Sequence, residues 1–267
     1  MDSEEKKVTA VDEHMTAARA AIEYIFLELP AARAYTLSAE GTAQRGQAKV
    51  TTELDLTYGD VRFDALGRAL EAAALPVRGT FFDLGSGVGR GVIAAALCYS
   101  LRLAVGVELL EPLHAAAVAG PLHRFLRLRD QLHSGAELDG GRAFSALDAT
   151  KLALEVELRC DDLFAVDISS ADVVFCCCVT WSSAIMQRLA TKLASELSSG
   201  ARVVTVGQRL PEVVDQGAQG GAIQFSVVWK EWAECDWGSE AFVVHTVQRM
   251  GELAARRYRK KANHGGR

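Results

Sequence analysis

The stretch from Thr80 to Gly91, with the sequence TFFDLGSGVGRG, constrains the fold more than any other part of the chain. Its apolar start predicts a short buried strand that ends at Asp83, and the run Val92–Leu97 predicts the start of a helix. Three glycines lie between them at alternate positions: Gly85, Gly87 and Gly89. Glycine adopts backbone angles that other residues avoid, and it lets a ligand approach the main chain closely. A strand, a glycine turn and a helix in this order are typical of a nucleotide-type cofactor site at the carboxyl edge of a parallel sheet.

The spacing of the glycines separates one class of cofactor from another. Dinucleotide sites follow the pattern G-x-G-x-x-G, which places a pyrophosphate at a helix N-terminus. The pattern here is D-x-G-x-G-x-G, which resembles the first motif of class I S-adenosylmethionine methyltransferases. Because that cofactor carries an ammonium and no phosphate, Asp83 is predicted to contact or organise its methionyl end. A second predicted strand, Leu103–Val107, ends at Glu108, whose carboxylate can accept both ribose hydroxyls. The alternative is a glycine turn that only packs a helix on a sheet.

Length, charge and cysteine usage exclude several classes of protein. The 267 residues allow one large domain with an appendage or two small domains. The net charge of −5 argues against a protein that coats nucleic acid over its whole surface. No apolar run approaches the roughly 18 residues of a membrane span, and no secretory signal opens the chain, so we expect no membrane association. The six cysteines include no C-x-x-C pair, so we expect no metal site and reduced, buried thiols in a nuclear or cytoplasmic protein.

The remaining patterns predict an α/β protein with a seven-stranded, mostly parallel sheet and helices on both faces. Helical periodicity over Val8–Leu29, ended by Pro30, predicts an N-terminal helix that covers the sheet, and residues 38–50 predict a loop or linker. The nearly continuous apolar run Ala171–Val179 predicts a central strand buried on both faces. The other predicted segments are a helix from Pro112 to about Leu132, strands at Leu154–Leu158 and Ala201–Val206, and an antiparallel pair at Ile223–Trp232 and Ala241–Met250.

We therefore divide the chain into three parts. Residues 1–50 form a small N-terminal helical extension and linker, and residues 51–252 form the methyltransferase domain. Residues 253–267 form a tail whose run Arg256–Lys261 is basic in an otherwise acidic protein. Such a tail is usually solvated, but it could also contact nucleic-acid phosphate.

Two further segments lie where class I methyltransferases bind cofactor and acceptor. Asp161 and Asp162 follow the predicted third strand, where an acidic residue accepts the adenine amino group; the alternative is a helix or turn cap. Cys178 and Trp181 follow the central strand, where the acceptor atom is received. Tyr58-Gly59-Asp60 is by itself an ordinary turn, but the segment before the first strand often closes over the cofactor.

Four places in the same order resemble the non-SET histone lysine methyltransferases of the disruptor-of-telomeric-silencing type, which have the Rossmann-like class I methyltransferase fold. Tyr58-Gly59-Asp60 with Phe63 is similar to the family's Y-G-E-x-x-F, and FFDLGSGVGRG at 81–91 is close to its F-V-D-L-G-S-G-V-G-Q. Val105–Glu108 matches its Y-G-V-E, and Trp237 with Val244-His245-Thr246 resembles its late W…L-H-T.

This resemblance implies S-adenosylmethionine as cofactor, a lysine of a histone, nucleosome or other protein as acceptor, and a role in chromatin. It assigns Asp83, Gly85, Gly87 and Glu108 to the methionyl and ribose parts, Asp161 to adenine, and the 58–60 loop to closure over the methionyl end. Trp181, and also Trp237, would line the lysine channel. The predicted cofactor-binding residues are Tyr58, Gly59, Asp60, Asp83, Gly85, Ser86, Gly87, Gly89, Glu108, Asp161 and Asp162. The predicted catalytic residues, at the acceptor end of the site, are Tyr58, Cys178, Trp181 and Trp237.

The chain also departs from the family pattern. The family's Asn-Asn-Phe-x-Phe element corresponds to Cys177-Cys178-Val179-Thr180-Trp181, so the asparagine amide is lost. The family's glutamate is Asp60 here, its glutamine is Arg90, and a late channel tyrosine corresponds to Val243. The cofactor half is better preserved than the acceptor half. Two alternatives therefore stand beside a protein-lysine methyltransferase: a class I methyltransferase for a small molecule or nucleic acid, and a catalytically silent cofactor-binding module.

Overall fold

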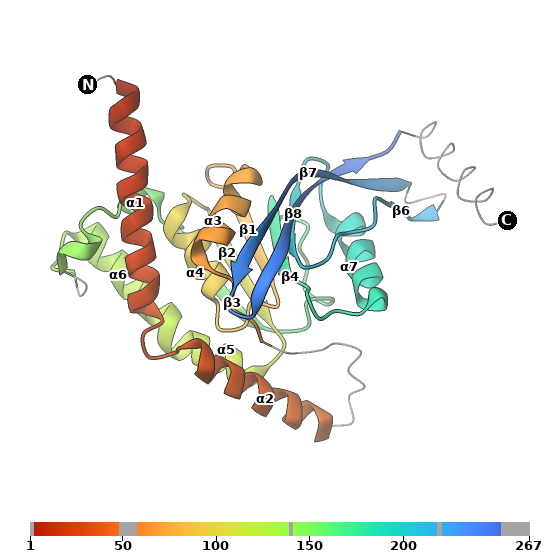
Figure 1. Ribbon diagram of the computed structural model, residues 1–267, viewed down its shortest axis with the longest axis horizontal. Coiled ribbons are helices and arrows are strands. Elements are labelled where there is room, and N and C mark those ends of the chain that lie inside the picture. The colour runs from red at the N-terminus through yellow and green to blue at the C-terminus, as the bar shows by residue number, and fades with distance from the viewer. Residues whose placement is uncertain (1–2, 48–57, 139–140, 218–220, 252–267) are drawn as a thin grey trace.

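A mixed eight-stranded sheet runs through the molecule in the order β3-β2-β1-β4-β5-β8-β7-β6 (Figure 1). The structure is a computed structural model that describes residues 3–47, 58–138, 141–217 and 221–251. Strands β1 to β5 are parallel, and β8, β7 and β6 continue the sheet in antiparallel pairs. The strands are β1 (Thr80–Leu84), β2 (Leu103–Glu108), β3 (Glu155–Cys160), β4 (Val173–Cys177), β5 (Arg202–Val206), β6 (Val213–Asp215), β7 (Ala222–Cys235) and β8 (Gly238–Arg249).

The expected α/β, Rossmann-like fold is confirmed, with one strand more than the seven predicted. Short β6 is the additional strand, and it pairs with the start of β7. Three residues with an Asp at the end give too short an alternation to identify a strand from sequence. The helices are α1 (Ser3–Ile25), α2 (Ala31–Gln47), α3 (Phe63–Ala72), α4 (Arg90–Cys98), α5 (Glu111–Ala117), η1 (Val118–Leu122), α6 (His123–Ser134), η2 (Gly141–Phe144), η3 (Ala149–Lys151) and α7 (Ser183–Glu196).

Side chains of the central strands alternate between two apolar layers, as the period of two in a strand requires. Phe81 and Phe175 face the layer formed with α1, α3 and α4, whereas Phe82 and Val174 face the layer formed with α7. This alternation continues through the cysteine run at the end of β4. Cys176 lies in the α7 layer and Cys177 packs on the other, so neighbouring thiols lie on opposite faces of the sheet.

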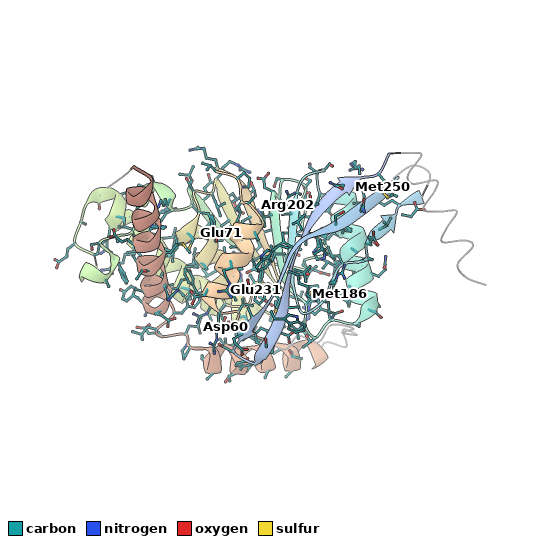
Figure 2. The ribbon with its side chains drawn as sticks, turned by 45° about the horizontal axis from the view of Figure 1, so that its top comes forward. Asp60, Glu71, Met186, Arg202, Glu231 and Met250 are labelled. Carbon is teal, nitrogen blue, oxygen red and sulfur yellow. The ribbon has the colours of Figure 1, made fainter. Side chains whose placement is uncertain are left out.

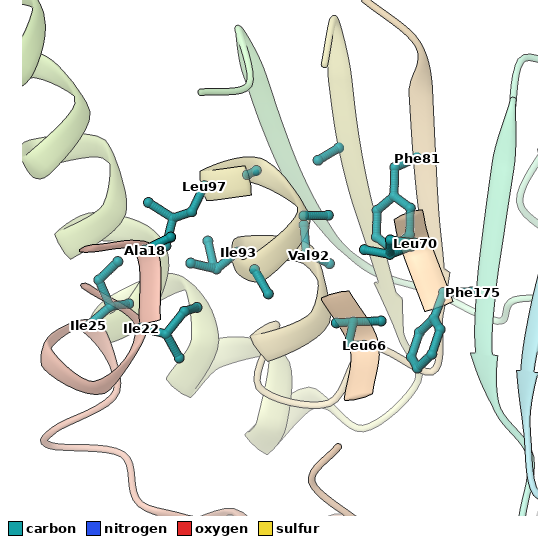
Figure 3. Close-up of a cluster of buried hydrophobic side chains, with 14 of the residues drawn as sticks. Ala18, Ile22, Ile25, Leu66, Leu70, Phe81, Val92, Ile93, Leu97 and Phe175 are labelled. Atoms are coloured by element: carbon teal, nitrogen blue, oxygen red, sulfur yellow. The ribbon is translucent and has the colours of Figure 1, made fainter. Parts of the chain in front are cut away.

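The N-terminal helix shares its core with the sheet domain. Figure 3 shows Ala18, Ile22 and Ile25 of α1 next to Ile93 and Leu97 of α4, all of them buried. Burial of each such large aliphatic side chain contributes about 1.5–3 kcal/mol. The expected extension at 1–50 is therefore packed into the main domain and has no separate apolar core among its described residues.

The segment at 38–47 differs from the expected loop, because α2 continues to Gln47. The helix is polar and contains Gly41, a composition that suggested a linker. Tertiary packing decides the structure here: Leu37 and Ser38 are buried, and a Cβ at Gly41 would lie 3.1 Å from Cβ of Leu110. The close approach of α2 to the start of α5 thus stabilises a helix that contains two unfavourable glycines, Gly41 and Gly46. Residues 48–50 lie outside the described residues.

The long helix predicted from Pro112 is present but is interrupted. Helices α5 and α6 are joined without a break by η1, a π-helical turn that contains Pro121. Proline inside an α-helix removes one hydrogen bond and clashes with the preceding turn, and a π-turn relieves both effects. The basic tail at 253–267 lies outside the described residues. Within the described part of the chain, no helix combines the length and apolar character of a membrane span.

His245 on β8 is fully buried and uses both ring nitrogens. Its Nε2 accepts from the backbone N–H of Leu210 at 3.4 Å, so Nδ1 carries the proton and donates to the carbonyl oxygen of Val203 at 3.2 Å. Burial lowers the pKa of His245 to about 4. The folded protein therefore holds this histidine neutral at every pH above that value.

We predict that His245 makes the fold sensitive to acid. The unfolded chain, with an ordinary histidine pKa near 6.5, binds the proton more strongly, so the stabilisation present above about pH 6.5 is lost as pH falls toward 4. Between pH 7.5 and pH 5 the loss should be about 2 kcal/mol. The free energy of unfolding is measured with urea at both pH values. Between them, His245→Gln should lose about 2 kcal/mol less than wild type, whatever its stability at pH 7.5. Equal losses in the two proteins would contradict the prediction.

Candidate functional site

A cavity lies at the carboxyl ends of β1, β2 and β4, where the order of the strands reverses around β1. It is lined by Asp83 at the end of β1, Glu108 at the end of β2 and Cys177 at the end of β4. In open α/β sheets such a reversal leaves a crevice in which ligands bind. Figure 2 shows Asp60 of the cavity near one end of the strands and Arg202, which begins β5, near the other.

The glycine turn after β1 forms the floor of this cavity. Gly87 has a φ of +56°, in the left-handed region that favours glycine. A Cβ at Gly87 would lie 2.5 Å from Cε2 of Tyr58, so the tyrosine ring rests directly on the turn. Gly89, with a φ of +82°, caps helix α4, and its α-carbon faces Leu158 and not the cavity. Both positions require glycine, as the sequence predicted, but only Gly87 lines the cavity.

Glu108 joins the end of β2 to the glycine turn. Its Oε2 accepts from the backbone N–H of Gly87 at 2.8 Å, and its Oε1 accepts from that of Leu110 at 2.7 Å. Burial raises the pKa of the Glu108 carboxyl, and these backbone donors oppose the rise. Each carboxylate oxygen has further lone pairs, so Glu108 can still accept hydroxyl donors from a ligand.

Asp83 is a buried carboxyl beside a second acid. Burial, and secondarily the nearby Glu108 charge, raise the pKa of Asp83 to about 8. No cationic side chain within the described ranges forms an ion pair with it at 4 Å or less. A buried carboxylate without a cation is unfavourable, so a positively charged ligand beside Asp83 would stabilise its ionised form. Nor do the described residues place three or more metal-ligand side chains together for a metal ion.

Tyr58 and Asp60 cover the cavity from the side opposite the glycine turn. The Tyr58 hydroxyl donates to Oδ1 of Asp60 at 2.9 Å, and Nε of Arg90 lies 2.7 Å from Oδ2. The Nε–H is not aimed at that oxygen, so this contact is an ion pair without a hydrogen bond. Burial raises the pKa of Asp60, and the Arg90 charge opposes the rise. Burial and the Asp60 charge raise the pKa of the Tyr58 hydroxyl well above its usual value.

Asp161 and Asp162 lie beside the cavity in a turn that uses their side chains locally. Asp161 Oδ1 accepts from the backbone N–H of Asp162, and Asp162 Oδ1 accepts from that of Phe164. The backbone N–H of Asp161 in turn donates to the carbonyl oxygen of Glu108. The turn-cap interpretation therefore describes Asp162, while Asp161 keeps its second carboxylate oxygen for a ligand.

Trp181 lies at the opposite end of the cavity, beyond β4. A Cβ at Gly85 would lie 3.9 Å from Cζ2 of Trp181, so the indole lies over the backbone of the glycine turn. Cys177 also lines the cavity, whereas Cys178 does not. The Cys178 thiol points into the α7 layer and donates to the carbonyl oxygen of Val206 at 3.2 Å. The alternation of side chains in β4 thus exchanges the two cysteines relative to the sequence-based assignment.

Gln208, which the sequence reasoning missed, fixes the turn that carries Trp181. Its Nε2 donates to the carbonyl oxygens of Cys178 at 2.7 Å and of Trp181 at 2.6 Å. An amide from the loop after β5 therefore stabilises the segment in which the family's asparagine is missing. Trp237 is not among the residues that line the cavity. Its ring packs on Gly59, where a Cβ would lie 2.6 Å from Cζ3, and so supports the covering segment from outside the cavity.

The cavity brings together most of the residues predicted from sequence. Those that line it are Tyr58, Gly59, Asp60, Asp83, Gly85, Ser86, Gly87, Glu108, Asp161, Asp162 and Trp181. Gly89, Cys178 and Trp237 are not among the lining residues. Arg90 and Cys177 also line the cavity, and both stand at positions where the chain departs from the family pattern: Arg90 replaces the family's glutamine, and Cys177 lies in the segment that replaces its Asn-Asn-Phe-x-Phe element.

Comparison with known proteins identifies relatives of this chain. A family model described as "Histone methylation protein DOT1" matches residues 47–215, more than half of the chain. The matched region contains the glycine turn, both buried acids and Trp181, and it excludes Trp237 and the Val244–Thr246 segment. No curated protein gives a significant match.

Several solved methyltransferase structures are similar to this chain. An RNA methyltransferase from Salinibacter ruber, solved with S-adenosyl-L-homocysteine, is 23% identical over 71% of this chain and 94% of its own, with a TM-score of 0.46. The rRNA methyltransferase aviRa from Streptomyces viridochromogenes is 20% identical over 70% of this chain and 86% of its own, with a TM-score of 0.47. The Bacillus subtilis tRNA methyltransferase TrmK is 14% identical over 70% and 65%, with a TM-score of 0.40.

We predict that the two buried acids dominate cofactor affinity. Asp83→Ala or Glu108→Ala should weaken S-adenosylmethionine binding at least tenfold, about 1.4 kcal/mol, because each removes a carboxylate that faces the ligand. Calorimetric titration of the folded variants measures the change. Glu155→Ala, which removes an exposed carboxylate at the amino end of β3, should bind like wild type. Wild-type affinity in Asp83→Ala and Glu108→Ala would show that the cofactor binds elsewhere.

Proposed function

This chain belongs to the DOT1 family of histone methylation proteins, and from that premise we propose that it methylates a lysine side chain of a protein. It is a methyltransferase that uses S-adenosylmethionine. The observation that best supports the proposed site is the cavity at the ends of β1 and β2, in which two buried acids face one another without a cationic partner among the described residues.

The residues present fit this cofactor. S-adenosylmethionine supplies a methyl group on a positively charged sulfonium when it is bound. Its ammonium and sulfonium charges would compensate Asp83 and Glu108, which otherwise pay the cost of burial as isolated acids. Leu110, Leu113 and Leu163 add an apolar wall beside Asp161, where a flat adenine could lie. Each of these assignments follows from the chemistry of the lining groups.

Each lining group then has a defined role in the proposed reaction. Asp83 would pair with the ammonium, Glu108 would accept hydrogen bonds from the ribose hydroxyls, and Asp161 would accept one from the adenine amino group. Tyr58 closes over the methionyl end from the covering segment. Together these contacts align the methyl group for an in-line displacement, which needs orientation and a favourable field more than it needs acid–base groups.

Trp181 would form one wall of the channel through which the acceptor lysine arrives. An indole face attracts the ammonium as it enters, and an apolar channel lowers the lysine pKa so that the neutral amine can attack. The amine would accept the methyl group, the C–S electron pair would remain on the cofactor sulfur, and the amine proton would pass to solvent. Cys177 also lines the cavity. Burial raises the pKa of its thiol, so the thiol stays protonated and cannot take the proton from the amine.

The basic tail, whose structure lies outside the described residues, would add contacts to the phosphates of a nucleosome. If chromatin is the substrate, the protein acts in the nucleus. A small-molecule or nucleic-acid acceptor remains the alternative outcome, since the segment Cys177–Trp181 lacks the family's asparagine amide.

We predict that a labelling experiment will identify a protein lysine as the methyl acceptor. Radiolabelled S-adenosylmethionine should transfer methyl groups to nucleosomes or core histones, and acid hydrolysis should release the label as methyl-lysine. Total cell protein and total RNA are offered in parallel, and Asp83→Ala is the inactive control. Label in RNA or in small molecules alone would overturn the proposed acceptor, and calorimetric cofactor binding with no transfer to any acceptor would identify a silent module.

A second prediction concerns Trp181 alone. Trp181→Ala should raise KM for the labelled protein acceptor about tenfold or more, because a cation–aromatic contact and a channel wall are lost. The affinity for S-adenosylmethionine should change less than about threefold, since the cofactor is held by other residues. Trp232→Ala removes an exposed tryptophan of β7 and should leave both constants unchanged. Equal losses in acceptor KM and cofactor affinity would assign Trp181 to the cofactor instead.

A further inference from the structure

We propose that Arg90 and Asp60 form a latch that holds the Tyr58–Asp60 segment closed over the cofactor cavity and sets the rates at which the cofactor enters and leaves. This inference rests on the proposed cofactor site. It gives Arg90 a positioning role, because its contact with Asp60 fixes the residues that cover the cavity.

The latch joins two elements that are separated by the cavity. Arg90 is the first residue of α4, directly after the glycine turn, while Asp60 belongs to the covering segment. Their side chains are 19% and 8% exposed, so the ion pair is largely shielded from solvent and salt. Burial strengthens their attraction relative to exposed ion pairs such as Arg33–Glu40, and it also adds a desolvation cost.

Both partners are held in place by further contacts. The Arg90 guanidinium lies 4.3 Å from the centre of the Phe26 ring, at the end of α1. Asp60 also accepts from the Tyr58 hydroxyl, and its carbonyl oxygen accepts from the backbone N–H of Asp236 at 3.3 Å. The ion pair therefore connects the N-terminal helix, the glycine turn and the β7–β8 hairpin at one point.

The closed position leaves no room above Gly87. The Tyr58 ring rests on that residue, and Tyr35 of α2 packs edge-on against the ring with centroids 5.5 Å apart. A ligand that approaches Asp83 past Gly87 must first displace the Tyr58 ring. Since the Tyr58 hydroxyl is hydrogen-bonded to Asp60, that displacement strains or breaks the ion pair between Asp60 and Arg90.

The two latch positions also depart together from the family pattern, which has glutamate and glutamine there. Glutamine carries no charge, so the family pair forms no ion pair. In this chain the shorter carboxylate at position 60 and the longer cation at position 90 meet at 2.7 Å. The pair is thus a property of this sequence and not of the fold.

Rapid-mixing measurements of S-adenosylhomocysteine binding, followed by tryptophan fluorescence, test the latch. Arg90→Gln and Asp60→Asn should each raise both the association and the dissociation rate constants, on the order of tenfold, because opening no longer breaks a charge pair. The double variant should bind and release the ligand no faster than either single variant, because each single substitution already removes the ion pair. Arg90→Lys, which keeps the charge, should retain slow exchange.

Arg188→Gln is the matched control, because Arg188 also lies over an aromatic ring, that of Phe164, but is not among the cavity-lining residues. Its two rate constants should equal those of wild type. A rise in dissociation alone for Arg90→Gln and Asp60→Asn would overturn the latch and leave Arg90 as a simple ligand contact. Additive effects in the double variant would overturn it as well. Failure of wild type to bind S-adenosylhomocysteine by calorimetry would instead overturn the cofactor site, and the latch with it.

Discussion

The hydrogen bond between the Gly87 amide and the Glu108 carboxylate organises the cofactor end of this protein. It fixes the glycine turn after β1 to the end of β2, although the residues are 21 positions apart in the chain. Gly87 itself adopts a left-handed backbone, with a φ of +56° that favours glycine. Burial raises the pKa of Glu108, and the second amide, from Leu110, opposes that rise and favours the ionised carboxylate. The pairing of β1 with β2, the geometry of the glycine turn and the position of the Glu108 carboxylate therefore depend on one another.

This is also why the sequence predicts this half of the site so well. A strand, a turn and a helix that are contiguous in the chain carry their own signals, and Asp83 and Glu108 end adjacent apolar runs. The acceptor half depends on which face of β4 each cysteine occupies, and a shift of one position exchanges Cys177 and Cys178. Gln208 reaches that segment from another loop, so no local pattern could indicate its contacts.

Long-range packing accounts for the other differences from the sequence-based expectation. Residues 38–47 have the composition of a linker, yet they form a helix because α5 covers their apolar side and packs closely against Gly41. The contact between Arg90 and Asp60 joins residues on two separate elements, and each looks unremarkable alone. Residues that act through partners distant in sequence are invisible to periodicity and spacing, whereas those that shape a turn or end a strand are visible.

The raised pKa of Asp83 makes cofactor binding an acid–base reaction as well as an association. At neutral pH the free protein carries a proton on this carboxyl, and an amino acid ammonium, with an ordinary pKa near 8, carries one too. If the two form the proposed ion pair, one proton must leave for the solvent. The heat of binding would then vary with the ionisation enthalpy of the buffer, and a cell that becomes acidic would weaken methyl-donor binding without any change in the donor's concentration.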